Sequence, residues 1–143
     1  MKTALLSLGV WVFGFIYPFI DPTEPKASES VLVIYRQREF GGREYGINVN
    51  GKRIGWLAPN RFIRVNVPIG QVKIESKRDF FTDNKTLTFT ADPGQTYYVK
   101  AVEDVDFMSR SLPMTRISEE QAKRELARIK PMEPETPTIQ QDH

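Results

Sequence analysis

Apolar and polar residues alternate through the middle of the chain, in short segments separated by turn-forming residues. In residues 71–77, for example, Val72 and Ile74 alternate with charged positions. Successive side chains of a strand point to opposite faces, so a period of two indicates half-buried β-strands. Residues 31–38 begin with apolar residues on both faces, which predicts a central strand. The pattern predicts seven strands, at 31–38, 45–50, 52–58, 62–67, 71–77, 86–91 and 96–102.

The turns between these segments support an antiparallel arrangement. Asn50-Gly51 favours a two-residue hairpin turn, in which both central residues must tolerate positive φ. Pro68 to Gly70 and Asp92 to Gly94 are further turn sequences. Several short strands joined by turns are typical of a sandwich or a barrel. The sequence therefore predicts an all-β fold, an antiparallel β-sandwich of about seven strands, immunoglobulin- or transthyretin-like, over residues 31–117.

The turn before the last strand carries a more specific signal. Residues 92–97 resemble the corner of immunoglobulin-like sandwiches, where a tyrosine hydroxyl bonds back to the preceding turn. The sequence therefore predicts either this contact for Tyr97 or an ordinary core tyrosine.

A helical pattern follows the strands. Ser118 and Gln121 form a capping box, in which each side chain satisfies an open backbone N–H group. The pattern predicts a short C-terminal helix in residues 118–130, from Glu119 to Lys130, because Pro131 stops it. Two interpretations are open for its apolar stripe: packing on its own sandwich, or docking to a partner. The stripe consists of Ala122, Leu126 and Ile129. Residues 131–143 are polar and proline-rich, and are predicted to be disordered.

The N-terminus has the pattern of a targeting or membrane segment. Residues 4–20 are uncharged and would form an apolar helix of about 25 Å. Such a length is near the lower limit for a bilayer span and slightly long for a signal-peptide core. Lys2 precedes the run and acidic residues follow it, so the remaining chain is directed outward. Residues 1–20 are thus predicted as a signal peptide or a membrane anchor, and 21–30 as a linker.

Composition narrows the possible chemistry. The chain has no cysteine, and its one histidine is His143, the last residue. Disulfides, thiol catalysis, zinc-thiolate sites and histidine triads are therefore excluded. The net charge is +2, and the charges are spread along the strands. Nucleic-acid binding requires a denser basic stripe, so no nucleic-acid partner is predicted.

One acidic cluster could be considered for metal or hydrolytic chemistry. Glu103, Asp104 and Asp106 lie just after the last predicted strand. Calcium needs six to eight oxygen ligands, but apolar Phe107 and Met108 follow instead. A solvated loop is therefore the preferred interpretation. No pair of carboxylates stands out as a hydrolase site. The sequence predicts a protein without enzymatic activity, with no catalytic residue, no metal and no cofactor.

Aromatic residues at strand ends and in loops are the candidate contact residues. A surface that combines aromatic residues and arginines has the composition of a protein interface. Two alternatives are that these rings cap the open ends of the sandwich, or that they stack on sugars. The predicted partner-binding residues are Phe40, Tyr45, Trp56, Phe62, Phe80 and Phe81.

Five stretches resemble the DUF2846 family of bacterial envelope proteins. They are Val33–Arg36, Phe40–Gly42, Ile47–Gly70, Pro93–Val99 and Ser118–Glu120. The resemblance implies a small β-sandwich of the cell envelope, and it implies no activity and no catalytic residue. Many members of the family are lipoproteins. This chain lacks the necessary cysteine, so any membrane attachment would depend on residues 4–20.

These observations together predict a non-catalytic interaction or structural module. The expected location is the periplasm, free or anchored to the inner membrane, within a larger assembly. Its expected partners are other envelope proteins, and the membrane through residues 4–20 if they are retained. The alternative is a secreted module that binds a glycan or another ligand. A hydrolase using surface carboxylates is the third hypothesis.

Overall fold

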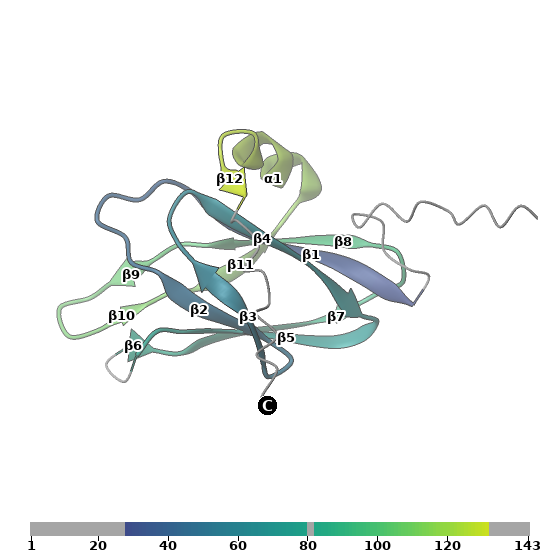
Figure 1. Ribbon diagram of the computed structural model, residues 1–143, viewed down its shortest axis with the longest axis horizontal. Helices are drawn as coiled ribbons and strands as arrows, with labels where there is room; N and C mark the ends of the chain where they lie inside the picture. The colour runs from purple at the N-terminus through teal and green to yellow at the C-terminus, as the bar shows by residue number, and fades with distance from the viewer. Residues whose placement is uncertain (1–27, 80–81, 132–143) are drawn as a thin grey trace, which may run out of the picture.

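The protein is all-β, as the sequence predicts. The structure is a computed structural model that describes residues 28–79 and 82–131 (Figure 1). These residues form twelve strands and one helix, α1 (Glu119–Leu126). Seven strands correspond to the predicted segments, with ends that differ by one or two residues. They are β1 (Glu29–Arg36), β2 (Tyr45–Val49), β3 (Lys52–Leu57), β4 (Arg61–Pro68), β5 (Gly70–Lys77), β7 (Lys85–Ala91) and β8 (Thr96–Ala101).

Five further strands are short. They are β6 (Thr82–Asp83), β9 (Asp104–Val105), β10 (Arg110–Ser111), β11 (Met114–Ile117) and β12 (Lys130–Pro131). One sheet has the order β11-β8-β1-β4-β12 and a second has the order β3-β2-β5-β7. A small third sheet, β6-β10-β9, lies at one end of the molecule (Figure 1).

The first sheet is mixed, which corrects the expectation of purely antiparallel pairing. β1 is antiparallel to β4 but parallel to β8, with Val31 opposite Thr96. All four strands of the second sheet come between β1 and β8 in the sequence. The chain then re-enters the first sheet as β8, which runs parallel to β1. A strand shows the same alternation of side chains in either pairing, so periodicity could not reveal this arrangement.

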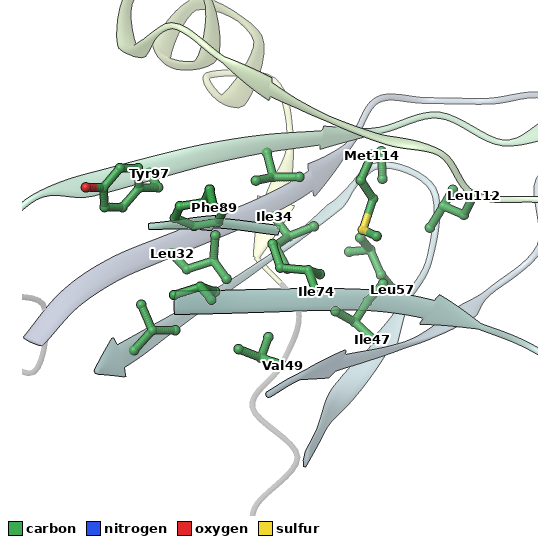
Figure 2. Close-up of a cluster of buried hydrophobic side chains, with 14 of the residues drawn as sticks. Leu32, Ile34, Ile47, Val49, Leu57, Ile74, Phe89, Tyr97, Leu112 and Met114 are labelled. Atoms are coloured by element: carbon green, nitrogen blue, oxygen red, sulfur yellow. The ribbon is translucent and has the colours of Figure 1, made fainter. Parts of the chain in front are cut away.

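The main core lies between the two larger sheets. Leu32 and Ile34 of β1 belong to one buried cluster with Val72 and Ile74 of β5, and all four are fully buried. Figure 2 shows Leu32, Ile34 and Ile74 in this cluster. β1 is central, as its apolar pattern predicts, because it lies between β8 and β4. Its other face is also covered. On that face Tyr35 contacts the residues of α1.

The helix begins where the sequence predicts but ends four residues earlier. The Ser118 hydroxyl accepts a hydrogen bond from the backbone N–H of Gln121 (3.4 Å), which confirms the cap. The Gln121 side chain donates to Glu125 instead of closing the capping box. After Leu126 the N–H of Ile129 bonds to the carbonyl three residues back, which tightens the turn and ends the helix. Pro131, predicted as the start of the disordered tail, lies in β12 beside β4.

The boundary before β1 also differs from the prediction. β1 takes in Glu29 and Ser30, the last two residues of the predicted linker. Ser30 is fully buried and its hydroxyl donates a hydrogen bond to the carbonyl of Asp92. The predicted signal peptide or anchor, residues 1–20, lies outside the described residues. Within residues 28–79 and 82–131, no helix is long and apolar enough to cross a membrane.

Of the two interpretations of Tyr97, the structure shows the corner contact. Its hydroxyl accepts a hydrogen bond from the backbone N–H of Asp92 (2.7 Å), and its ring packs against Phe89 at 4.8 Å. The bond ties the start of β8 to the end of β7, at the end of the molecule opposite the third sheet (Figure 1).

Tyr97→Phe is therefore expected to lower the free energy of unfolding by about 1–2 kcal/mol, because it leaves the Asp92 N–H without its acceptor. Urea denaturation measures the change. Tyr98→Phe is the matched control, since the Tyr98 hydroxyl bonds to no described residue. Equal losses in the two variants would contradict a stabilising role for the corner.

Candidate interaction surface

A fully buried arginine, Arg36, forms hydrogen bonds to several segments at one end of the molecule. Arg36 is the last residue of β1, and its guanidinium donates to the carbonyl of Leu57 (2.9 Å), the carbonyl of Arg43 and the carboxylate of Glu39. Its Nε atom has no hydrogen-bond partner among the described residues. A buried charge is tolerated only when it is paired and hydrogen-bonded. These contacts therefore hold residues 37–44 against the body of the fold.

Glu103, which follows β8, completes the buried network. Its side chain is 4% exposed and lies 3.7 Å from the Arg36 guanidinium. The carboxylate accepts hydrogen bonds from the Tyr45 hydroxyl (2.9 Å), the Arg43 backbone N–H (3.1 Å) and the Arg110 guanidinium (3.4 Å). Glu103 thereby connects residues 37–44 to residues 102–110.

The network shifts the pKa values of two of its members. Burial alone would raise the pKa of the Glu103 carboxyl. The hydrogen bonds from Arg43 and Tyr45 and the charges of Arg36 and Arg110 outweigh burial and hold that pKa below its usual range. Burial and the hydrogen bond to Glu103 raise the pKa of Tyr45 to about 12. Glu103 is thus charged and Tyr45 neutral at physiological pH.

The loop approaches this network so closely that one position has to be glycine. The second carboxylate oxygen of Glu39 accepts from the Glu103 N–H (3.0 Å), which draws the two loops together. A Cβ atom on Gly42 would lie 2.7 Å from Pro59 Cγ and 3.1 Å from the Arg36 guanidinium. Gly42 is therefore required for close packing here.

Large apolar side chains project from these two tethered loops. Phe40 is 110% exposed, Phe107 95% and Met108 85%, relative to a reference residue. The two loops lie at the same end of the molecule as the third sheet (Figure 1). We call this set the apolar loop surface, and it consists of Phe40, Val102, Val105, Phe107 and Met108. A hollow of about 320 Å³ beside it is lined by Arg43 and Arg110 as well as by Phe107 and Met108.

The predicted contact residues do not gather in one place. Phe40 is on the surface, as expected. Tyr45 is 1% exposed, so its expected surface position is wrong. Its side chain points inward and its hydroxyl donates a hydrogen bond to the buried Glu103 carboxylate. Trp56 is half-buried, with the Arg53 guanidinium 4.6 Å from its ring centre. Phe62 faces away from the main core but is half-buried under α1.

The remaining predicted residues are either in the helix or outside the described part of the chain. Ala122 and Ile129 are buried with Tyr35, and Leu126 packs against the same cluster. The apolar stripe therefore packs on its own sheet, which was one of its two interpretations. Phe80 and Phe81 lie outside the described residues.

A second polar cluster holds α1 in place. The Glu125 carboxylate accepts from the Tyr35 hydroxyl (2.6 Å), the Lys100 ammonium (3.1 Å) and the Gln121 side chain (3.1 Å). Burial would raise the pKa of Glu125, but these three donors hold it below its usual range. Burial and the bond to Glu125 raise the pKa of Tyr35. Glu125 is thus charged, and Tyr35 is neutral, when the helix is docked.

The solvated loop predicted for the acidic cluster is wrong for Glu103. Asp104 and Asp106 are exposed, whereas Glu103 turns inward to Arg36. No group of three potential ligand side chains forms in the described part of the chain. Phe107, an aromatic residue in a loop, and Met108 are not among the predicted partner-binding residues. The sequence signal for this exposed surface is the apolar pair Phe107-Met108 within an otherwise polar loop.

Comparison of the chain with protein-family models, with curated proteins and with solved structures gave no match. The resemblance to the DUF2846 family stays a prediction from the quoted residues.

Proposed function

We propose that this chain is a non-catalytic interaction module of the bacterial envelope, which binds another envelope protein through the apolar loop surface. Under this proposal the fold is an immunoglobulin- or transthyretin-like sandwich that faces the periplasm. Residues 4–20 target it there, and anchor it to the inner membrane if they are retained.

The exposure of Phe40, Phe107 and Met108 is the observation that carries the proposal. Three large apolar side chains this exposed, on two loops that hydrogen bonds join at one end of the fold, are unfavourably solvated in the free protein. Aromatic residues and methionine are enriched in protein interfaces, as is arginine. Arg43 and Arg110 stand beside them.

The buried network beneath the surface supports the same function. Glu39 and Glu103 tie the backbones of the two loops to each other and to Arg36. Loops held in this way lose little conformational entropy on binding, so more of the contact energy appears as affinity. The matching partner surface is an apolar groove with acidic groups at its rim, opposite Arg43 and Arg110.

The test replaces the three exposed side chains together, as Phe40→Ser, Phe107→Ser and Met108→Ser. We expect the free energy of unfolding to change by less than about 0.5 kcal/mol for each exposed position. The full-length variant should lose the envelope protein that cross-links to the wild type after gentle detergent extraction. Mass spectrometry identifies the partner and also shows whether the chain still begins at Met1.

Ile69→Ser is the matched control, since Ile69 is 46% exposed in the turn after β4, at the opposite end of β1 from Phe40. This control should keep the partner. Retention of the partner by the triple variant would overturn the proposal. A clipped chain with no protein partner would favour a secreted module that binds a glycan or another ligand.

A further inference from the structure

Three arginines line one cavity beside the helix. The cavity has a volume of about 670 Å³ and lies between the loop after β1 and the C-terminal end of α1. Arg38 comes from the loop, and Arg124 and Arg128 come from the helix and the turn that ends it. Arg124 lies in the last turn of α1 and Arg128 in the turn that follows it, and both line the same space.

The positive charge in this cavity is not balanced by the described part of the chain. None of the three guanidiniums forms an ion pair with a described carboxylate. Glu125 also lines the cavity, but its oxygens are already bound by Tyr35, Lys100 and Gln121. Like charges that line one cavity repel one another, and a bound anion would relieve that repulsion.

The other lining groups complete a site for a small anionic ligand. The Asn60 N–H bonds to the Gln37 carbonyl (3.2 Å), which fixes the two loops that form one wall. The side-chain amides of Gln37 and Asn60 provide neutral hydrogen-bonding groups, and the largely buried Ile129 provides an apolar patch. A volume of this size is within the usual range for small-molecule sites.

We propose that this cavity binds the phosphate group of a phosphomonoester, held by Arg38, Arg124 and Arg128. The planar guanidinium donates two parallel hydrogen bonds to phosphate oxygens, which makes arginine well suited to this anion. A phosphomonoester carries a charge of about −1.5 to −2 near neutral pH. The C-terminal end of α1 contributes only about half a negative charge, so the three arginines outweigh it.

Isothermal titration calorimetry on the full-length protein in an uncharged detergent tests the proposal. Glycerol 3-phosphate is the soluble probe, and dihexanoyl phosphatidic acid presents the same group on a lipid. Glycerol and dihexanoyl phosphatidylcholine are the blanks, and each probe is also titrated into micelles alone. We expect saturable binding of the phosphomonoesters only. Tighter binding of the lipid would identify a headgroup as the source, and tighter binding of glycerol 3-phosphate a soluble metabolite.

Substitutions then locate the site. Arg38→Gln, Arg124→Gln and Arg128→Gln should each weaken binding roughly tenfold, because each removes a charge-assisted hydrogen bond. Lys85→Gln removes one exposed charge from β7 and should leave the affinity unchanged. The proposal is overturned if neither probe binds, if the triple arginine variant binds normally while folded, or if Lys85→Gln weakens binding equally. These results do not depend on the envelope partner, so the two proposals can fail separately.

Discussion

Arg36→Met is expected to lower the free energy of unfolding by about 3–5 kcal/mol, which is the usual effect of removing one partner of a buried ion pair. Methionine fills most of the arginine volume, so the loss comes mainly from charge and hydrogen bonding. Glu103, at 4% exposure, would keep the partly exposed Arg110 as its one cationic partner among the described residues. The carbonyls of Leu57 and Arg43 would also lose their donor. Urea denaturation followed by tryptophan fluorescence measures the change.

A second substitution separates charge from packing. In Arg36→Met with Glu103→Gln, the uncompensated carboxylate is gone. The amide oxygen can accept from the Arg43 N–H, and the amide NH2 can donate to the Tyr45 hydroxyl oxygen in place of the second carboxylate oxygen. This double variant should be more stable than Arg36→Met alone. Arg110→Met is the surface control, because the Arg110 side chain is 36% exposed, and it should cost less than about 1 kcal/mol. Equal losses for Arg36→Met and Arg110→Met would show that the buried network does not hold this end of the fold.

Local features of the structure could be predicted because their causes lie within a few neighbouring residues. At the hairpin turn, Asn50 and Gly51 both have positive φ, 50° and 82°, as the dipeptide indicates. The Tyr97 corner spans only five residues. The seven longer strands each contain enough residues for the alternation of side chains to be recognised.

Pairing and burial of charge could not be predicted, because they depend on residues far apart in the sequence. Arg36 ends an apolar run and has the position of a polar strand end. Its burial results from Leu57 and Glu103, which are 21 and more residues away. The parallel contact of β1 with β8 depends on the path of the intervening sheet. The two-residue strands β9 and β10 are too short to show any periodicity.

The candidate contact surface was only partly predicted for the same reason. Phe40, Tyr45 and Phe62 are all aromatic residues near loops or strand ends, and composition cannot distinguish them. Tyr45 is drawn inward by Glu103, and Phe62 is covered by α1. Phe40 is exposed, whereas its neighbour Glu39 bonds inward to Arg36 and to the Glu103 N–H.

High pH is expected to destabilise the fold through Tyr45. Burial is the largest cause that raises the pKa of Tyr45, from 10.0 to about 12. The hydrogen bond to Glu103 and the negative charge of Glu103 act in the same direction. Below pH 10 both the folded and the unfolded states keep the proton, so the full contribution to stability is present. Between pH 10 and 12 the unfolded state loses its proton first, and the free energy of unfolding falls. A difference of two pKa units corresponds to a loss of about 2 kcal/mol by pH 12, where the folded-state hydroxyl is half-deprotonated, and of about 3 kcal/mol at still higher pH.

Tyr45→Phe isolates this contribution in urea unfolding curves measured from pH 7 to 12. At pH 7 the variant should be about 1 kcal/mol less stable than the wild type, because Glu103 loses one hydrogen-bond donor. As the pH rises the wild type should lose stability faster, so that the order of the two proteins reverses before pH 12. Tyr98→Phe should keep the pH dependence of the wild type. Tyr35, whose pKa is also raised, acts in the same direction and remains in every variant. Parallel curves for Tyr45→Phe and the wild type would mean that the Tyr45 hydroxyl titrates alike in both states, and that its bond to Glu103 contributes nothing to the alkaline stability.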